Sequence, residues 1–103
     1  PVYTYIDGFA ASAATLISVA GNKRFITHNS LMLIHQLSAS ESGKFEELKD
    51  QYNNLKGLMD IIKKIYLENT KISQENLELL LKQDIWLDSV KCLHYGLVDK
   101  IIK

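Results

Sequence analysis

Short apolar segments alternate with polar turns in the first third of the chain. The run Val2-Tyr3-Thr4-Tyr5-Ile6 is β-branched and aromatic, and it predicts a buried strand. Residues 23–27 and 31–35 predict two further short strands, which flank a turn at Thr27-His28-Asn29-Ser30. Residues 37–43 predict a polar loop or a weak edge strand, and residues 97–102 predict a closing strand.

The segment after the first strand changes to small and apolar residues. Small helix formers follow Gly8, and an apolar run then ends at Gly21, a residue type that is common just after a helix. We therefore expect the chain to pass from a strand into the first turn of a helix near Ser12. Small neighbours at this point allow another backbone or a substrate to approach closely.

The middle of the chain carries one long amphipathic pattern. Apolar residues recur at intervals of three and four, which predicts a helix over residues 44–69 with the seam Phe45, Leu48, Tyr52, Leu55, Met59, Ile62 and Tyr66. Gly57 lies inside this helix and costs about 1 kcal/mol relative to alanine. Such a helix is too long to bury its whole seam on a small core. Either part of it projects and packs on another subunit, or it is an ordinary amphipathic core helix.

Two shorter helices are expected after the long one. Ser73 is a plausible N-cap for a helix over residues 74–82. Residues 83–87 interrupt the helical pattern, and Asp88 or Ser89 then caps a third helix that ends near Gly96.

Composition narrows the functional classes. Lys plus Arg and Asp plus Glu each number 12, so no net field attracts nucleic acid or an anionic membrane. The single cysteine, Cys92, excludes an internal disulfide and fits a reducing compartment, which indicates the cytoplasm. The longest nearly apolar run, residues 9–20, is too short to span a bilayer. A chain that opens on Pro1 and enters a strand at once looks cut from a longer one.

Ser12 and His35 are the first candidates for chemistry. A serine at a helix start lies beside unpaired backbone N–H groups, and such groups stabilise a developing oxyanion. The alternative for an Ala/Ser-rich helix start is a tight packing surface, which is the more common case. His35 ends a buried strand, from which its ring can reach into a site. The alternative is a core histidine satisfied by backbone groups.

Asp84 is the third candidate, in a short connection beside apolar Ile85 and Trp86. That setting predicts a partly buried carboxylate, which needs a partner. A helix cap or a lysine would satisfy it without any chemistry. Trp86 is expected to pack in the core beneath Asp84. Three other polar residues have simpler expected roles, in a turn, at the surface and as a helix cap: His28, His94 and Asp88.

Three motifs follow one another along the chain: Gly8-Phe9-Ala10-Ala11-Ser12-Ala13-Ala14, then Asn29-Ser30 with Met32-Leu33-Ile34-His35-Gln36, then Asp84-Ile85-Trp86-Leu87 followed by Tyr95-Gly96-Leu97-Val98-Asp99. Together they make the chain resemble the C-terminal half of the ClpP-type serine peptidases. The resemblance covers nearly the whole chain, and the separation of His35 from Asp84 suits the family's long handle helix. The short turn over residues 20–24 is more similar to phage and viral members.

The resemblance implies an α/β fold of the ClpP/crotonase-like type. Residues 1–103 would be the C-terminal portion of a single peptidase domain, and residues 44–69 would be its handle helix. The protein would be a homo-oligomer, assembled as a ring through that helix. A Clp-type ATPase would dock on a hydrophobic pocket that here includes Tyr5, Asp7, Phe25 and Thr27.

The resemblance also implies a set of site residues. Ser12 would be the nucleophile, His35 the general base and Asp84 the carboxylate that orients the base. The backbone N–H of Ala13 would be one oxyanion donor. No metal or other cofactor is implied. The residues that would lie beside a bound peptide are Leu37, Ser38 and Ala39.

The implied activity is hydrolysis of peptide bonds through an acyl-enzyme on Ser12. One alternative is a catalytically inactive ClpP-like assembly module, in which the helix over residues 44–69 carries the function. Another is a phage-type capsid maturation (prohead) protease. Two further rivals share the fold: an acyl-CoA enzyme of the crotonase type, and a signal-peptide peptidase relative with a Ser–Lys dyad.

Overall fold

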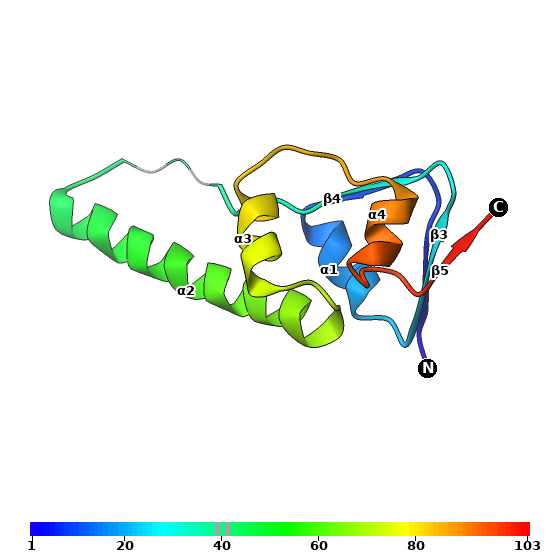
Figure 1. The fold of residues 1–103 in the computed structure, drawn as a ribbon. Coiled ribbons are helices and arrows are strands. Elements are labelled where there is room, and N and C mark those ends of the chain that lie inside the picture. Colours follow the sequence, from blue (N-terminus) through cyan, green and yellow to red (C-terminus); the bar gives the residue numbers. More distant parts are fainter. Residues whose placement is uncertain (39, 41) are drawn as a thin grey trace.

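The computed structural model describes residues 1–38, 40 and 42–103. Short strands and helices alternate along this part of the chain. Figure 1 shows α2 extending away from the other elements, which gather at one end. In chain order the elements are β1 (Tyr3–Ile6), β2 (Phe9–Ala11), α1 (Ala13–Val19), β3 (Lys23–Thr27), β4 (Leu31–Leu33), α2 (Phe45–Asn69), α3 (Gln74–Leu81), α4 (Ser89–His94) and β5 (Lys100–Ile102).

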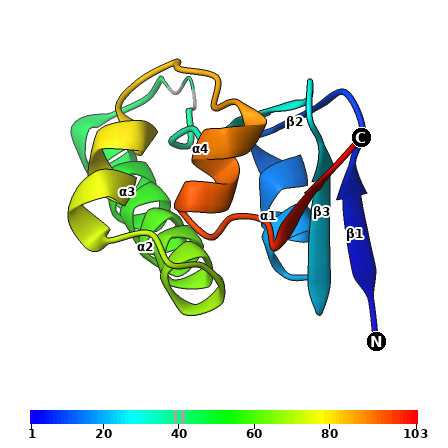
Figure 2. The same cartoon turned by 45° about the vertical axis from the view of Figure 1, so that its right-hand side comes forward.

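The strands form two parallel sheets. One has the order β1-β3-β5, and the other consists of β2 and β4. The strands β3 and β4 flank the predicted turn at residues 27–30 but enter different sheets. Parallel neighbours need a crossover connection. α1 lies in the crossover from β1 to β3 and in the crossover from β2 to β4. Figure 2 shows α1 and α4 on one side of the β1-β3-β5 sheet. The predicted α/β class is confirmed.

The segment that follows Gly8 contains a strand that the pattern of small residues did not predict. Residues 9–11 pair with β4 before α1 begins at Ala13. Ala10 and Ala11 have low strand propensity, but their backbone groups form hydrogen bonds with the neighbouring strand β4. Gly21 follows α1 but is not in the left-handed conformation common for a glycine at that position. A Cβ at Gly21 would lie 2.8 Å from Cγ2 of Thr4, so the close approach of β1 requires glycine here.

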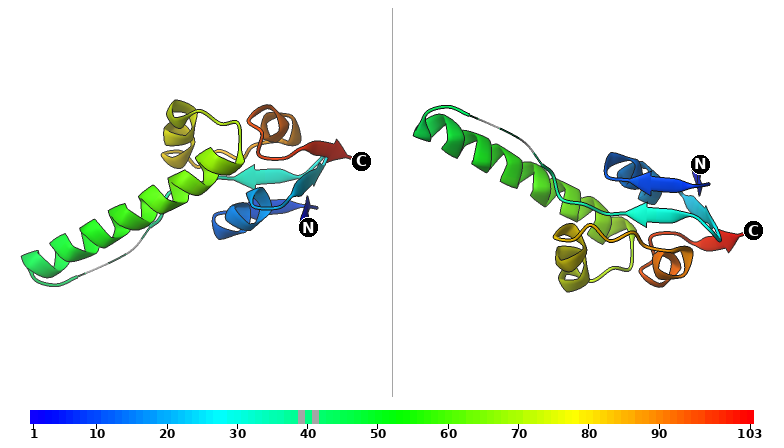
Figure 3. Two further views of the ribbon diagram at one scale, coloured as in Figure 1. Left: turned by 90° about the horizontal axis from the view of Figure 1, so that it is seen from below. Right: turned by 90° about the horizontal axis from the view of Figure 1, so that it is seen from above.

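α2 agrees with the helix predicted over residues 44–69. Its apolar seam is exposed near the start of the helix and buried near the end. Tyr66 near its end is 1% exposed, whereas Phe45 and Tyr52 are 75% and 65% exposed. Figure 3 shows the first turns of α2 projecting well beyond the rest of the fold, and the molecule measures 52 × 24 × 24 Å. The last turns therefore belong to the core, and the first turns do not.

The two short helices begin as predicted. Ser73 and Asp88 each accept a hydrogen bond from the backbone N–H three residues further on, at 3.1 and 2.8 Å. Gly96 follows α4 with a φ of 72°. The N–H of Leu97 donates to the Cys92 carbonyl at 2.9 Å, which closes the helix in a Schellman motif. These local bonds fix where α4 begins and ends.

A buried cation ties the C-terminal strand to the rest of the fold. Arg24 on β3 is 9% exposed, and its guanidinium contacts both carboxylate oxygens of Asp99, at 2.8 and 3.1 Å. It also donates to the Asn69 carbonyl at the end of α2, at 2.6 Å. The hydrogen bonds from Arg24 lower the pKa of Asp99. The sequence pattern did not single out Arg24.

Candidate active site

Ser12 lies in the turn between β2 and α1. Its φ and ψ are 52° and −118°, a conformation that costs a residue with a side chain about 1–3 kcal/mol. The N–H of Ser12 donates to the Leu33 carbonyl at 3.0 Å, and the Ser12 carbonyl accepts the Thr15 N–H at 3.0 Å. The strand β4 and the first turn of α1 thus hold the serine at the carboxyl edge of the sheet.

The register between β4 and the segment before α4 brings His35 and Asp84 together. Met32 and Leu87 form an antiparallel bridge, in which each N–H donates to the other's carbonyl, at 2.9 and 2.6 Å. His35 lies three residues after Met32, and Asp84 lies three residues before Leu87. Continuing this register places the two side chains opposite each other. Just beyond this pair, the Gln36 N–H donates to the Leu81 carbonyl at 3.2 Å and ties the segment to the end of α3.

His35 and Asp84 are in direct contact at the surface. Nε2 of the imidazole lies 2.7 Å from Oδ1 of the carboxylate. In the neutral ring, Nε2–H donates a hydrogen bond to Asp84, which leaves Nδ1 able to accept a proton. The side chain of His35 is 29% exposed, and that of Asp84 is 82% exposed. The partial burial predicted for Asp84 is therefore wrong.

The apolar neighbours of Asp84 do not bury it, because they lie at the surface themselves. Ile85 and Trp86 are 47% and 42% exposed, whereas Leu87 is buried at the bridge to β4. Trp86, expected beneath Asp84 in the core, instead meets the ring of Phe9 edge-on, with ring centroids 5.8 Å apart. One buried residue anchors this extended segment, and the residues before it face outward.

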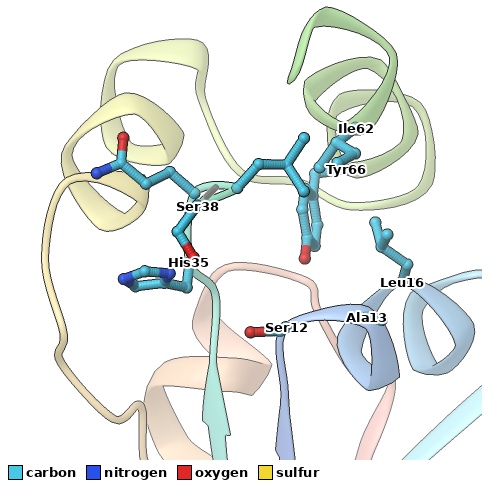
Figure 4. A pocket seen from close by; sticks show the side chains of 9 residues that line it. Ser12, Ala13, Leu16, His35, Ser38, Ile62 and Tyr66 are labelled. Carbon is cyan, nitrogen blue, oxygen red and sulfur yellow. The ribbon is translucent and has the colours of Figure 1, made fainter. Parts of the chain in front are cut away.

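Ser12 and His35 line one cavity of about 260 Å³. Figure 4 shows the Ser12 side chain pointing into this cavity near His35, with Leu16, Ile62 and Tyr66 forming an apolar wall. Within the described part of the chain, the Ser12 hydroxyl makes no hydrogen bond to His35. Catalytic hydrogen bonds are often long before substrate binds, so shared access to one cavity is the relevant geometry.

The N–H of Ala13 stands at the first position of α1, where a helix leaves its amides without partners. Among the residues that the structure describes, no acceptor bonds to it. Ala13 also lines the cavity. Ala13 therefore offers an available N–H donor beside the cavity, and its role toward an oxyanion stays a prediction.

Comparison with known proteins decides the family. The model of the family described as Clp protease matches residues 1–103, the whole chain. The chain belongs to the Clp protease family. The family predicted from the three motifs is thereby confirmed, while the similarity to phage and viral members stays a prediction.

Three curated relatives in the Clp protease family are 30–34% identical to this chain over the aligned residues. A protein named ATP-dependent Clp protease proteolytic subunit, from Deinococcus radiodurans, is 34% identical over 104 residues, which is 99% of this chain and 51% of the relative. Subunit 2 from Treponema denticola is 34% identical over 100% of this chain and 52% of the relative. Subunit 1 from Protochlamydia amoebophila is 30% identical over 99% and 52%. The chain spans about half the length of the curated relatives it matches.

The loop after His35 borders the cavity of this Clp family member. Leu37 and Ser38 both line it, and their contact with a bound peptide stays a prediction. The N–H of Leu37 donates to Sδ of Met59 on α2, at 3.2 Å. The third predicted residue, Ala39, lies outside the described residues. The described residues of this loop are in neither helix nor strand.

The sequence pattern missed a polar contact beneath the cavity. Thr15 on α1 and Tyr66 on α2 are both buried, and their hydroxyls bond to each other. The Thr15 hydroxyl also donates to the Ser12 carbonyl at 2.6 Å. Tyr66 stood in the predicted apolar seam, where its ring packs like the other seam residues, so nothing in the pattern marked its hydroxyl.

The remaining candidates take the simpler roles expected of them. His28 and His94 are exposed, and Asp88 caps α4. Cys92 is fully buried, and burial raises the pKa of its thiol to about 12, which keeps it protonated and unreactive as a nucleophile. No helix in the described ranges is long and apolar enough to cross a membrane. The compartment indicated by the single cysteine stays a prediction.

Proposed function

We propose that this chain supplies the nucleophile, base and orienting carboxylate of a serine peptidase of the Clp protease family. The observation that carries the proposal is that Ser12 and His35 line one cavity while Asp84 contacts one nitrogen of His35. These residues come from the β2–α1 turn, the end of β4 and the α3–α4 connection. The substrate would be a peptide or an unfolded protein segment.

The geometry supports a hydrolytic cycle with a covalent intermediate. His35 would take the hydroxyl proton of Ser12 as its Oγ attacks the scissile carbonyl. Asp84 would hold the ring and stabilise the imidazolium that forms. The N–H of Ala13 would bond to the oxyanion of the tetrahedral intermediate. His35 would then return the proton to the leaving amine, and water would release the acyl group from Ser12.

We include a Clp-type ATPase among the proposed partners, because relatives are named as ATP-dependent proteolytic subunits. The predicted docking pocket corresponds to one exposed region of β1 and β3. Tyr5 stacks on Phe25 there, with centroids 4.8 Å apart and 13° between the ring planes. Asp7 is exposed and Thr27 half-buried beside them. This surface offers two aromatic rings to a partner.

Fluorophosphonate labelling of the full-length protein tests the proposed activity. We expect an adduct on Ser12, mapped by mass spectrometry, because the reagent reacts with a serine whose proton a base removes. Ser12→Ala and His35→Ala should each abolish labelling and lower peptide hydrolysis by several orders of magnitude. Ser73→Ala, which removes only a helix cap, should label normally. An unlabelled Ser12 in a folded protein would refute the peptidase.

The second candidate is an assembly module without activity, and the exposed seam of α2 favours it. Leu48 and Tyr52 are 41% and 65% exposed on a helix that projects from the fold. A stable oligomer that shows no serine reactivity would support this candidate. A capsid maturation peptidase would differ from a general one in substrate, so digestion of a scaffold protein would separate those two.

A further inference from the structure

Two buried hydroxyls connect α2 to the turn that holds the nucleophile. The Thr15 hydroxyl donates to the Ser12 carbonyl oxygen at 2.6 Å, and the Tyr66 hydroxyl contacts the same Thr15 oxygen. Thr15 is 0% and Tyr66 1% exposed. Figure 4 shows the Tyr66 ring reaching from α2 with its hydroxyl directed toward the start of α1. Both side chains are almost fully removed from solvent, so their hydroxyls need hydrogen-bond partners within the protein.

The proton positions in this chain of bonds follow from counting donors. A threonine hydroxyl has one proton, and the Ser12 carbonyl can only accept. The Thr15 hydroxyl therefore donates its hydrogen bond to the Ser12 carbonyl, and the Tyr66 hydroxyl donates to the Thr15 oxygen. Burial raises the pKa of Tyr66, although the bond to Thr15 opposes the shift, so the phenol keeps its proton at neutral pH. The bonds thus run in one direction, toward the Ser12 carbonyl.

The Ser12 carbonyl and the Ala13 N–H belong to the same planar peptide unit. Bonds that hold the oxygen therefore also set the direction of the N–H. The oxygen accepts from the N–H and the hydroxyl of Thr15, at 3.0 and 2.6 Å. Donors on a carbonyl also polarise the amide and strengthen its N–H as a donor. The N–H at the other end of this unit is the proposed oxyanion donor.

We infer that Thr15 and Tyr66 are positioning residues that aim and polarise the Ala13 N–H for the oxyanion. This inference rests on the proposed function and deepens it, because it names what supports the oxyanion donor. Tyr66 lies in the last turns of α2, so the seating of that helix on the core sets the geometry of the donor. Neither side chain needs to touch the substrate's reacting atoms.

Tyr66→Phe tests the inference in the full-length protein, because it keeps the ring and removes the first donor of the chain. Outright loss of an oxyanion donor costs about 10²–10³ in kcat. A donor that is kept but less well aimed should cost about tenfold in kcat, with KM unchanged, because the oxyanion forms only in the transition state. A peptide boronate, whose tetrahedral adduct places an oxygen near Ala13, should bind about tenfold more weakly.

A series at Thr15 separates the hydroxyl from the shape of the side chain. Thr15→Val keeps the shape and should lower kcat at least as much as Tyr66→Phe. Thr15→Ser keeps the hydroxyl and should restore most of the rate. If Tyr66→Phe does not fold, the two Thr15 variants still test the inference. Equal kcat values for Thr15→Ser and Thr15→Val would overturn it.

Thr70→Val is the matched control. The Thr70 hydroxyl donates to the Tyr66 carbonyl at 2.7 Å, at the same end of α2, and Thr70 does not line the cavity. We expect its kcat and boronate affinity to match those of the unaltered protein. An active protein in which Tyr66→Phe leaves both values unchanged, or Thr70→Val lowers them equally, overturns this inference alone. An unaltered protein that reacts with neither fluorophosphonate nor boronate overturns the proposed function, and this inference with it.

Discussion

Each residue of the candidate site depends on a backbone position that brings it to the cavity. Ser12 directly follows β2, and its N–H bonds to the end of β4. His35 comes two residues after β4 and meets Asp84 at 2.7 Å. The carboxyl ends of parallel strands lie at the same edge of a sheet. A serine and a histidine that follow paired strands therefore share one cavity.

The role of His35 as a base predicts an acid limb in the pH profile. We expect kcat/KM for peptide hydrolysis to fall on the acid side of neutral pH, because a protonated imidazole cannot accept the proton of Ser12. Asp88→Asn should leave the shape of the profile unchanged, since Asp88 caps α4 and does not line the cavity. A rate that stays flat over this range would count against His35.

At the scale of elements, the helices show how one residue type has opposite effects in two settings. Gly57 lies inside α2, and a Cβ there would meet nothing within 4 Å. Gly96 follows α4 in the left-handed region, and a Cβ there would lie 2.7 Å from the backbone nitrogen of Lys71. At Gly57 the effect of adding a side chain is therefore set by helix propensity. At Gly96 it is set by backbone strain and a steric clash with Lys71.

Alanine at each glycine gives a matched pair of predictions. Gly57→Ala should raise the free energy of unfolding by about 1 kcal/mol, the difference in helix propensity. Gly96→Ala should lower it by more than about 1 kcal/mol, because φ is unfavourable for alanine and Lys71 blocks the space. Urea unfolding followed by circular dichroism measures both. A destabilised Gly57→Ala protein would show that α2 packs against something at that position.

At the scale of the whole molecule, the contacts of Arg24 join β3, β5 and the end of α2. The pKa of Asp99 is lowered in the folded state, so Asp99 contributes stability above its unfolded pKa, which is about 3.9. That contribution is lost as the pH falls below about 4 toward the folded value. Asp99→Asn should therefore make stability less dependent on pH below about 4.

Unfolding in urea between about pH 2 and pH 6 measures this effect. Asp50→Asn is the control, because Asp50 lies on the exposed first half of α2. An Asp99→Asn protein with the same acid dependence as the unaltered one would contradict the account. Asp99 is 45% exposed, so solvent screens the pair and the change in slope should be small.

The projecting half of α2 predicts how the molecule associates. Phe45 and Tyr52 are exposed on one seam, and each would gain about 1.5–3 kcal/mol from full burial against a second copy. We expect the full-length protein to be an oligomer by light scattering. Replacing both residues by serine should lower the mass of the assembly measured in solution, whereas Asn53→Ser should leave that mass unchanged. An oligomer unaffected by the double substitution would place the interface elsewhere.

Local patterns in the sequence were sufficient for the elements that depend on periodicity or on adjacent residues. The three- and four-residue spacing predicted α2 nearly to its ends, and Ser73 and Asp88 cap the helices that they precede. Caps and seams involve residues a few positions apart, so the sequence contains all the information they need. For Ser12, His35 and Asp84, composition and pattern left alternatives open, and the resemblance of three motifs grouped them.

Only the tertiary structure decided features that depend on distant neighbours. β2 forms because β4 lies beside it, although two of its three residues are alanines of low strand propensity. Asp84 is exposed because the segment before Leu87 crosses the surface, although its neighbours are apolar. Tyr66 lies in an apolar seam, yet its hydroxyl bonds to Thr15, which in turn bonds to the Ser12 carbonyl. Exposure and hydrogen bonding are set by what packs alongside, and those partners lie tens of residues away in the sequence.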